Sequence, residues 1–214
     1  MMKTTKRIIS VLVVTTWFVT LLHARAKTSS DHFVYLPIIV NPPLTVADFD
    51  TCDKINNLGG EMGAAYEPST SDRLTETYEP EVGRGCVARL DYKVPTGWSA
   101  FWLKLLHLDL TQHRRLSFDI NFIGQIDTST DMEIKVELKR DCHDQMCDEA
   151  WIQYVPGITD EWQTMTINLA DFYSLPDKLP PPSLSGIEEL VFTFEKDHIS
   201  SEGLVYLDNI VFEP

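Results

Sequence analysis

The chain has 214 residues, of which 32 are acidic and 18 are basic, so its formal charge at pH 7 is −14. Nucleic acids and anionic membrane surfaces attract basic proteins, and this charge therefore argues against both as partners. Cations, neutral glycans and other proteins remain. Twelve prolines, frequent β-branched residues and the lack of a long helical period favour an all-β chain.

The first segment has the pattern of a secretory signal peptide. Basic residues precede an apolar run from Ile8 to Leu22, and Ala24-Arg25-Ala26 fits a small-residue cleavage site. The apolar run is shorter than the roughly 20 residues that span a bilayer. We therefore favour cleavage over a membrane anchor. Residues 1–26 are predicted to be removed, leaving a protein that is secreted or held at the cell surface, with no membrane attachment of its own.

Residues 27–43 form a predicted spacer before a domain that spans residues 44–214. The spacer contains an apolar run from His32 to Val40, which Pro37 interrupts and Pro42-Pro43 follows. Proline cannot donate a hydrogen bond inside a sheet, so this run suits a linker or an edge strand better than a central strand.

Ten segments of the domain show the short alternation of apolar and polar residues that is typical of strands. They cover Thr45–Asp50, Arg73–Tyr78, Cys86–Val94, Trp98–Leu106, Leu116–Ile123, Met132–Lys139, Ala150–Val155, Trp162–Leu169, Ile187–Glu195 and Gly203–Pro214. Trp98–Leu106 also suits a buried helix, but Pro95, Gly97 and its aromatic content favour a strand. So many short strands predict an antiparallel two-sheet β-sandwich or jelly roll.

The last predicted strand is apolar on both faces, as a strand inside a sheet is. Strict alternation places Leu204, Tyr206, Ile210 and Phe212 on one face, and Asp208 interrupts that face. A buried carboxylate is costly unless it is neutralised, hydrogen-bonded or bound to a cation. The sequence therefore predicts a partner for this side chain.

The four cysteines of the domain are expected to form disulfides, because an even number of cysteines in a secreted chain suggests pairing. Of the three connectivities we favour Cys142–Cys147, which closes a short loop, with Cys52–Cys86 as the second pair. The alternative is a metal site that uses Cys142, His143 and Cys147, but it needs a reducing compartment and a fourth ligand.

Several motifs together indicate a family. They are Ala47-Asp48-Phe49-Asp50, Asn56-Asn57-Leu58-Gly59-Gly60, Trp98–Leu105, Leu108–Thr111, Leu116–Ile120 and Tyr206–Phe212. Between Leu44 and Glu213 the chain resembles the galactose-binding-like jelly rolls of bacterial secreted proteins, especially β-sandwich carbohydrate-binding modules. It is also similar to complex I intermediate-associated domains. The resemblance implies a jelly roll whose two chain ends lie close together.

The resemblance also implies a structural calcium ion. Carried over by position, its ligands are Asp48 or Asp50 from the first strand and Asp208 from the last. Ca²⁺ takes roughly six to eight oxygen ligands, and nearby carboxylate, amide and carbonyl oxygens could complete the set. The alternative is that the first two carboxylates are solvated and the third caps backbone amides.

Ligand-binding candidates come from residues predicted to point outward from the strands, together with residues near the cysteine loop. Aromatic rings stack on sugar faces and polar side chains bond sugar hydroxyls, and both kinds occur in this group. It comprises Asp119, Asn121, Glu133, Lys135, Glu137, Gln153, Tyr154 and Trp162. If their strands are neighbours, they build one polar face with aromatic rims; the alternative is an ordinary solvated surface. Trp98 and Trp102 share a face with Lys104, and at least one of the two is expected in the core.

These patterns predict a secreted, non-catalytic carbohydrate-binding module with a structural calcium ion and a neutral glycan or polysaccharide as its partner. The sequence has no nucleophile elbow, zinc-protease motif or phosphate loop. One alternative is a cell-surface interaction or assembly domain that docks a protein through Tyr35–Val40. The other is a jelly-roll glycoside hydrolase or lyase, which would need two carboxylates at a defined separation that sequence cannot select.

Overall fold

The structure is a computed structural model that describes residues 23–27, 33–37, 41–124, 132–143 and 146–214. The chain divides into two units, residues 1–40 and 41–214, which are described separately. In the first unit, strand β1 (His23–Lys27) pairs antiparallel with β2 (Phe33–Pro37). Within the described ranges, no helix is long and apolar enough to cross a membrane. The signal peptide and the spacer stay predictions.

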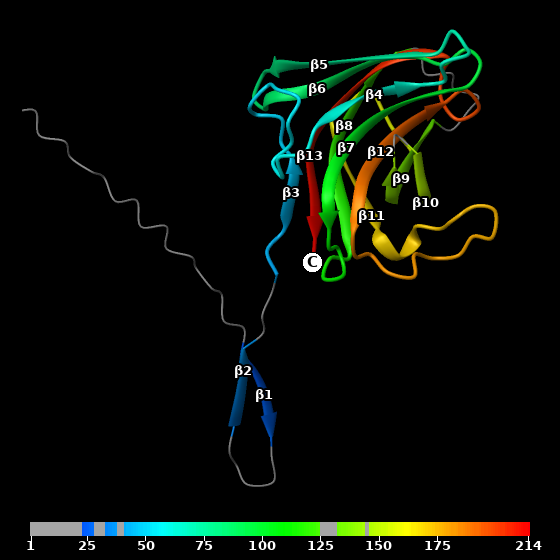
Figure 1. Cartoon of the computed structure of the whole chain (residues 1–214). Helices are drawn as coiled ribbons and strands as arrows, with labels where there is room; N and C mark the ends of the chain where they lie inside the picture. Colours follow the sequence, from blue (N-terminus) through cyan, green and yellow to red (C-terminus); the bar gives the residue numbers. More distant parts are fainter. Residues whose placement is uncertain (1–22, 28–32, 38–40, 125–131, 144–145) are drawn as a thin grey trace, which may run out of the picture. The chain divides into compact units, whose positions relative to one another are not determined.

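The second unit is an antiparallel two-sheet β-sandwich, which confirms the predicted fold class (Figure 1). The five-stranded sheet has the order β10 (Met146–Pro156), β9 (Glu133–His143), β12 (Ile187–Glu195), β7 (Trp98–Leu108) and β4 (Met62–Tyr66). The six-stranded sheet has the order β11 (Gln163–Asn168), β8 (Arg115–Ile123), β13 (Glu202–Glu213), β6 (Gly85–Lys93) and β5 (Arg73–Glu81), with β3 (Leu44–Ala47) also paired to β13. A short 3₁₀ helix, η1 (Leu169–Asp171), follows β11.

A single core fills the space between the two sheets. Phe118 on β8 and Phe192 on β12 are fully buried, and their rings meet edge to face with centroids 5.0 Å apart. Tyr92 on β6 stacks on Phe194 of β12 at 4.8 Å. Aromatic pairs of this kind add about 0.5–1.5 kcal/mol beyond their buried area. The sheets are thus joined by apolar side chains that project inward from both.

Strand β13 departs from strict alternation at one point. Its register to β8 shifts between Asp208 and Val211, and Asn209 adopts a positive φ of 48°. Such a bulge inserts an extra residue and reverses the facing of every residue beyond it. The predicted face of Leu204, Tyr206, Ile210 and Phe212 is therefore wrong. The fully buried, core-facing residues are Val205, Leu207, Ile210 and Phe212.

The two ends of the domain lie together, as the resemblance implied. Ala47 of β3 stands opposite Ile210 of β13, and Figure 1 shows the blue strand beside the red one. However, β3 ends at Ala47, because the chain turns at Phe49, whose φ is 54°. The N–H of Cys52 closes this turn by donating to the Phe49 carbonyl at 2.8 Å. The predicted first strand is therefore too long, and its acidic residues lie beyond the sheet.

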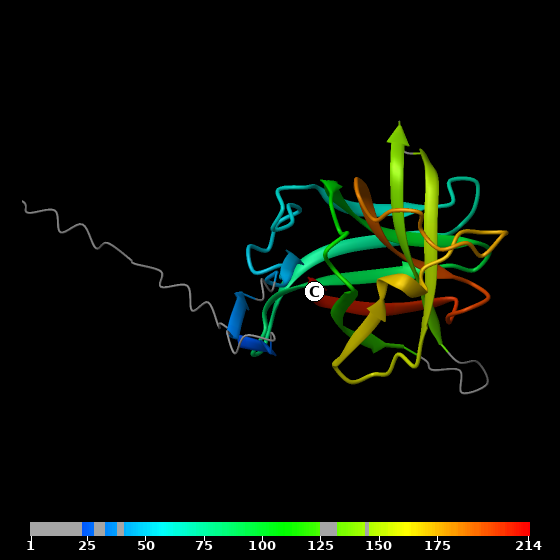
Figure 2. The same cartoon turned by 90° about the horizontal axis from the view of Figure 1, so that it is seen from below.

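Other element predictions hold with small changes. The Trp98 segment is a strand, β7, and not a helix. Strand β4 lies in a stretch that showed no strand pattern, since its sequence is Met-Gly-Ala-Ala-Tyr. Strand β11 begins at Gln163, so Trp162 lies just before it. The strands β9 and β10 form a long hairpin, which reaches past its neighbours in the view of Figure 2.

Both predicted disulfides are present. Cys52, in the turn after β3, is bonded to Cys86 at the start of β6, with Cα atoms 5.5 Å apart. Cys142 and Cys147 are direct cross-strand partners in the β9–β10 hairpin and are bonded to each other. The hairpin end is therefore closed by a covalent link, and the alternative of a cysteine metal site is wrong in this oxidised state.

Candidate functional site

A groove of about 850 Å³ lies on the outer face of the five-stranded sheet. Strands β4, β7, β12 and β9 form its floor, because they are consecutive in this sheet and their outward residues face the groove. The lining residues are Glu61, Ala64, Ala65, Tyr66, Pro68, Trp98, Ala100, Trp102, Lys104, Lys135, Glu137, Lys139, Glu189, Val191 and Thr193. Its volume is in the range of small-ligand sites, roughly 300–1,000 Å³.

Strand register arranges the floor into rows that cross the sheet. One row is Gly63, Trp102, Val191 and Glu137; the next is Ala65, Ala100, Thr193 and Lys135. Small or apolar residues thus occupy the centre of the floor. Trp98 and Trp102 lie along β7 at the edge of these small residues. They are four positions apart in the strand, which corresponds to about 13 Å. The far side of the groove is charged.

The two tryptophans share the outer face of β7, because the alternate positions Phe101, Leu103 and Leu105 point into the core. The expectation that one tryptophan is core is therefore wrong. Both indoles have defined contacts. Trp98 donates its Nε1–H to a carboxylate oxygen of Glu67 at 3.0 Å. The Trp102 ring lies over Gly63, the residue directly opposite it on β4.

A chain of ion pairs forms the charged side of the groove. The Lys135 ammonium lies between the carboxylates of Glu195 and Glu137, the latter at 3.4 Å. Glu137 is 8 % exposed, and it also accepts a hydrogen bond from the Thr193 hydroxyl at 2.6 Å and pairs with Lys139 at 3.5 Å. A separate pair joins Lys104 to Glu189. That pair crosses from β7 to β12, whereas along β9 the lining residues Lys135, Glu137 and Lys139 alternate in charge.

Two groups on this outer face, Lys135 and Tyr154, have shifted pKa values. Burial of Lys135 works to lower its pKa, but Glu137 and Glu195 outweigh burial and raise the pKa above its usual value. Burial and the nearby Glu195 carboxylate raise the pKa of Tyr154. Its hydroxyl therefore stays protonated at neutral pH and donates to Glu195 at 2.9 Å. The groove thus offers oriented donors and acceptors whose charges are internally balanced.

The structure brings together only part of the predicted ligand-binding set. Glu133, Lys135, Glu137 and Tyr154 share the outer face of the five-stranded sheet, on the neighbouring strands β9 and β10. Gln153 is opposite Val136, a fully buried core residue, and so lies on the other side of β10. It does not face the groove.

Asp119, Asn121 and Trp162 lie on the other sheet. Strand β8 pairs with β13 and β11, so its outward residues belong to the outer face of the six-stranded sheet. Consecutive strands β8 and β9 are thus in different sheets. The expectation of one continuous face that unites all these residues is wrong, and whether any of them binds a ligand stays a prediction.

Arg84 organises this second face and was missed by the sequence reasoning. Its guanidinium donates to Asp119 at 2.8 Å and to Asp208 at 3.2 Å, which are direct cross-strand partners, and lies 4.0 Å from the Trp162 ring centroid. Burial raises the pKa of Asp208 despite this contact. Burial also acts to raise the pKa of Asp119, but bonds from Thr164, Arg84 and Asn209 lower it overall.

The acids predicted to hold calcium have other partners. Asp208 is neutralised by Arg84, and its side chain is 2 % exposed. Asp48 accepts hydrogen bonds from the Asn57 amide at 2.8 Å and from the Asp50 N–H at 3.3 Å. A guanidinium against Asp208 does not fit a calcium ion at the same carboxylate. The ion stays a prediction, and its fit is limited to the turn that carries Asp48 and Asp50.

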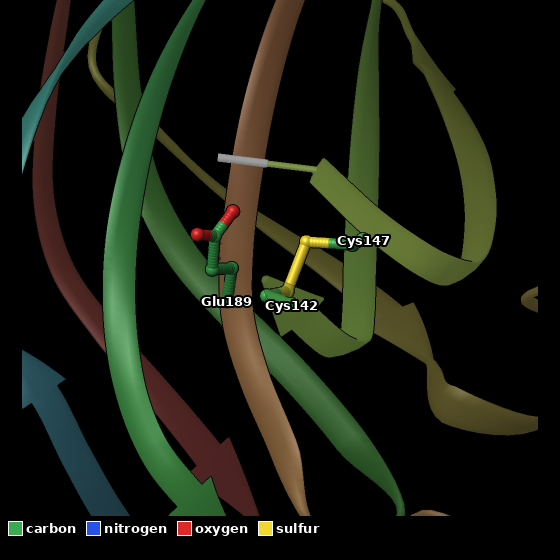
Figure 3. Close-up of side chains that lie close together, drawn as sticks. All are labelled: Cys142, Cys147 and Glu189. Atoms are coloured by element: carbon green, nitrogen blue, oxygen red, sulfur yellow. A yellow bond between two sulfur atoms is a disulfide. The ribbon is translucent and has the colours of Figure 1, made fainter. Parts of the chain in front are cut away.

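One other cluster has metal-ligand spacing in the part of the chain that the structure describes. It contains Cys142, Cys147 and Glu189, with the carboxylate of Glu189 beside the disulfide (Figure 3). Both sulfur atoms are in that bond. Thiolates, and not disulfide sulfurs, are the usual protein ligands for metals. The cluster is therefore no metal site in this oxidised state.

Sequence reasoning overlooked most of the groove. The lining residues that it missed include Trp98, Trp102, Lys104, Glu189 and Thr193. A usable signal was present in β7: tryptophans at positions 98 and 102 alternate with apolar residues that must fill the core. No such signal marked β12, whose outward Glu189, Val191 and Thr193 look ordinary until the sheet order is known.

Neither a family model nor a curated protein matches the sequence. Solved structures do match. One is a family 11 carbohydrate-binding module of a cellulosomal cellulase of Clostridium thermocellum, with 16 % identity and a TM-score of 0.59, covering 80 % of this chain and 94 % of that one. Another, from the same organism, is a family 11 module in complex with a β-1,3-1,4-mixed-linked tetrasaccharide, with 17 % identity and a TM-score of 0.58, covering 80 % and 95 %. At this identity the likeness establishes the fold: a β-sandwich like that of carbohydrate-binding modules.

Proposed function

We propose that the protein is a secreted, non-catalytic module that binds a neutral polysaccharide in the groove of the five-stranded sheet. The observation that carries this proposal is the pair of tryptophans, Trp98 and Trp102, which border a floor of small residues opposite a line of ordered polar groups. Indole faces stack on the C–H-rich faces of sugars, while fixed polar groups bond the hydroxyls.

The charges of the groove support a neutral ligand. Lys135 and Glu137 are paired with each other, and Lys104 is paired with Glu189. A strongly anionic or cationic chain would have to break these pairs or leave its own charges unmatched. Hydroxyl groups can instead accept from the ammonium groups and donate to the carboxylates without disturbing either pair.

The same contacts support a binding role over catalysis. Hydrolysis of a glycosidic bond needs one carboxyl group that gives up a proton and a second that acts as base or nucleophile. Two of the three carboxylates that line the groove are held in ion pairs: Glu137 by two lysines, with a bond from Thr193, and Glu189 by Lys104. Carboxylates tied to ammonium groups are suited to accept hydrogen bonds from sugar hydroxyls.

Two further observations bear on secretion and on the choice of ligand. The disulfides Cys52–Cys86 and Cys142–Cys147 suit an oxidising, extracytoplasmic compartment. The mixed-linked tetrasaccharide bound by one structural neighbour makes mixed-linked β-glucan the first polysaccharide to test. Cellulose-like and mannan-like neutral chains are the natural comparisons.

Affinity electrophoresis in gels that contain each polysaccharide tests the proposal. We expect retardation of the wild-type domain by at least one neutral polysaccharide, and loss of retardation in Trp98→Ala and Trp102→Ala. Removing one stacking ring should weaken binding roughly tenfold. Trp162→Ala, on the opposite face, is the matched control and should bind like the wild type.

Two results would count against the proposal. Binding that survives both groove substitutions but is lost in Trp162→Ala would move the ligand to the six-stranded sheet. Release of soluble sugars from the polysaccharide by the purified protein would contradict the non-catalytic role.

A further inference from the structure

The groove does not end at Trp98. A second cavity of about 290 Å³ lies on the far side of this residue, which therefore belongs to the wall of both. The cavity lies where the turn before β7 meets the turn after β12, and the Lys196 N–H donates to the Gly97 carbonyl between them at 3.1 Å. Its lining residues are Thr96, Gly97, Trp98, Glu195, Lys196, Asp197 and His198.

The buried side chain of Asp72 stabilises the turn before β7. Asp72 is fully buried and accepts hydrogen bonds from the Thr96 N–H at 3.1 Å and from the Thr96 hydroxyl. These bonds, with those of Thr70 and Gly97, outweigh burial and lower the pKa of Asp72. A Cβ on Gly97 would lie 2.8 Å from an Asp72 oxygen, so a larger residue here would displace the carboxylate that holds this turn. The wall beside Trp98 is thereby low and rigid.

The opposite wall is ordered as well. The His198 ring stacks on Tyr154 with a centroid distance of 4.4 Å, and its Nδ1 lies 3.1 Å from Glu133. The His198 N–H donates to the Glu195 carbonyl at 2.9 Å. The Glu195 carboxylate is in turn bonded by Lys135 and Tyr154. The polar groups of this wall are therefore in place before any ligand arrives.

From this geometry we propose that the cavity is a subsite for one further sugar residue of the chain that lies in the groove. The proposal rests on the proposed function of the groove. A cavity near the lower end of the range for small-ligand sites holds a group of about one sugar ring. Because Trp98 separates the groove from the cavity, its indole can contact the sugars on both sides.

The chemistry of the subsite favours a residue with neighbouring free hydroxyls. Asp197 is exposed, whereas the half-buried Glu195 carboxylate already accepts from Lys135 and Tyr154, so Asp197 is the carboxylate available to a ligand. Lys196 and His198 add donors. A carboxylate accepts two hydroxyl donors from adjacent carbons well, and such charge-assisted bonds are stronger than neutral ones.

Calorimetric titration with linear mixed-linked β-glucan oligosaccharides of increasing length tests the subsite. For the wild type we expect affinity to rise with oligosaccharide length. The final increase should occur when the oligosaccharide is long enough to place one sugar residue beyond Trp98. Asp197→Asn and His198→Ala should remove that increase, about tenfold in affinity, and leave shorter oligosaccharides unchanged. Asp177→Asn, an exposed acid in the loop before β12, is the matched control.

The possible outcomes distinguish the proposed subsite from the proposed function of the groove. If both subsite variants match the wild type at every length, the subsite is overturned and the groove stands. If either variant weakens short and long chains equally, the residue acts on the groove as a whole, and the subsite is again overturned. If the wild type binds no oligosaccharide of the series and Trp102→Ala has no effect on any polysaccharide, both proposals are overturned.

Discussion

The Trp102 indole occupies the space that any side chain at residue 63 would need. Gly63 is its direct partner across the β4–β7 ladder, and a Cβ added there would lie 2.7 Å from the indole Cζ2. Carbon atoms in contact are normally about 3.5–4.0 Å apart. The absence of a side chain at one position therefore determines how the aromatic ring at another faces the groove.

The first prediction follows from this contact. Gly63→Ala should displace the Trp102 ring and weaken polysaccharide binding several-fold to about tenfold, since a stacking contact is worth roughly 1 kcal/mol. Affinity electrophoresis and tryptophan fluorescence would measure binding and ring environment. In a Trp102→Ala background the same change should have no further effect on binding. An additional loss in the double variant would show that Gly63 acts by another route.

The second prediction concerns stability and pH. Asp119 has a lowered pKa in the folded protein, so its ionised form stabilises the fold. This contribution is present above the unfolded value near 3.8 and is lost as pH falls through the folded pKa. Asp119→Asn should destabilise the protein by roughly 1–3 kcal/mol at pH 7. The difference from wild type should shrink as the pH falls below that of the unfolded carboxyl group, as followed by urea unfolding.

The third prediction contrasts Asp208 with Asp119, its cross-strand partner. The pKa of Asp208 is raised by burial, so ionisation costs stability, and this cost grows as pH rises from the unfolded value through the folded pKa. Asp208→Asn should therefore be less harmful at pH 7 than Asp119→Asn. Arg84→Met should be more harmful than either, because it leaves two facing carboxylates without their cation. Equal losses in all three variants would contradict this division of roles.

The fourth prediction separates the two disulfides. In the chain-entropy description, the bond across 34 residues contributes about 4 kcal/mol, and the bond across 5 residues about 2 kcal/mol. A Cys52→Ser, Cys86→Ser variant should lose more stability in urea unfolding than a Cys142→Ser, Cys147→Ser variant. The reverse order would show that the hairpin end matters more to the fold than loop length implies.

The fifth prediction concerns the calcium ion, which we retain as a proposal confined to the turn of Asp48 and Asp50. We expect a chelator to lower the melting temperature of the wild type, and Asp48→Ala to abolish that shift. Because Arg84 already neutralises Asp208, the chelator shift should persist in Asp208→Asn. A melting temperature that the chelator leaves unchanged would contradict the proposed calcium ion.

Local patterns were enough for much of the fold. Leu116–Ile123 was predicted to be a strand from its alternation, and its alternate residues Phe118, Ile120 and Phe122 are fully buried, because side chains in any strand point to alternate faces. The bulge at Asp208 was not predictable in this way. One inserted residue reverses the facing of the rest of β13, and its presence depends on the neighbouring strands that β13 must fit.

The candidate site also combines features that the sequence predicts with features that depend on the tertiary structure. By itself the sequence determined that the chain is an all-β sandwich and which residues of most strands face inward. It favoured the cysteine pairs 52–86 and 142–147 among three connectivities, and the structure contains both. These features depend on local alternation and loop length. Only the tertiary structure decided that Trp98 and Trp102 line a groove with Lys135 and Glu137, and that Asp119 and Trp162 face away from it. The physical reason is that strand order is set by long-range packing, which separates the consecutive strands β8 and β9 into different sheets and places β12 between β7 and β9.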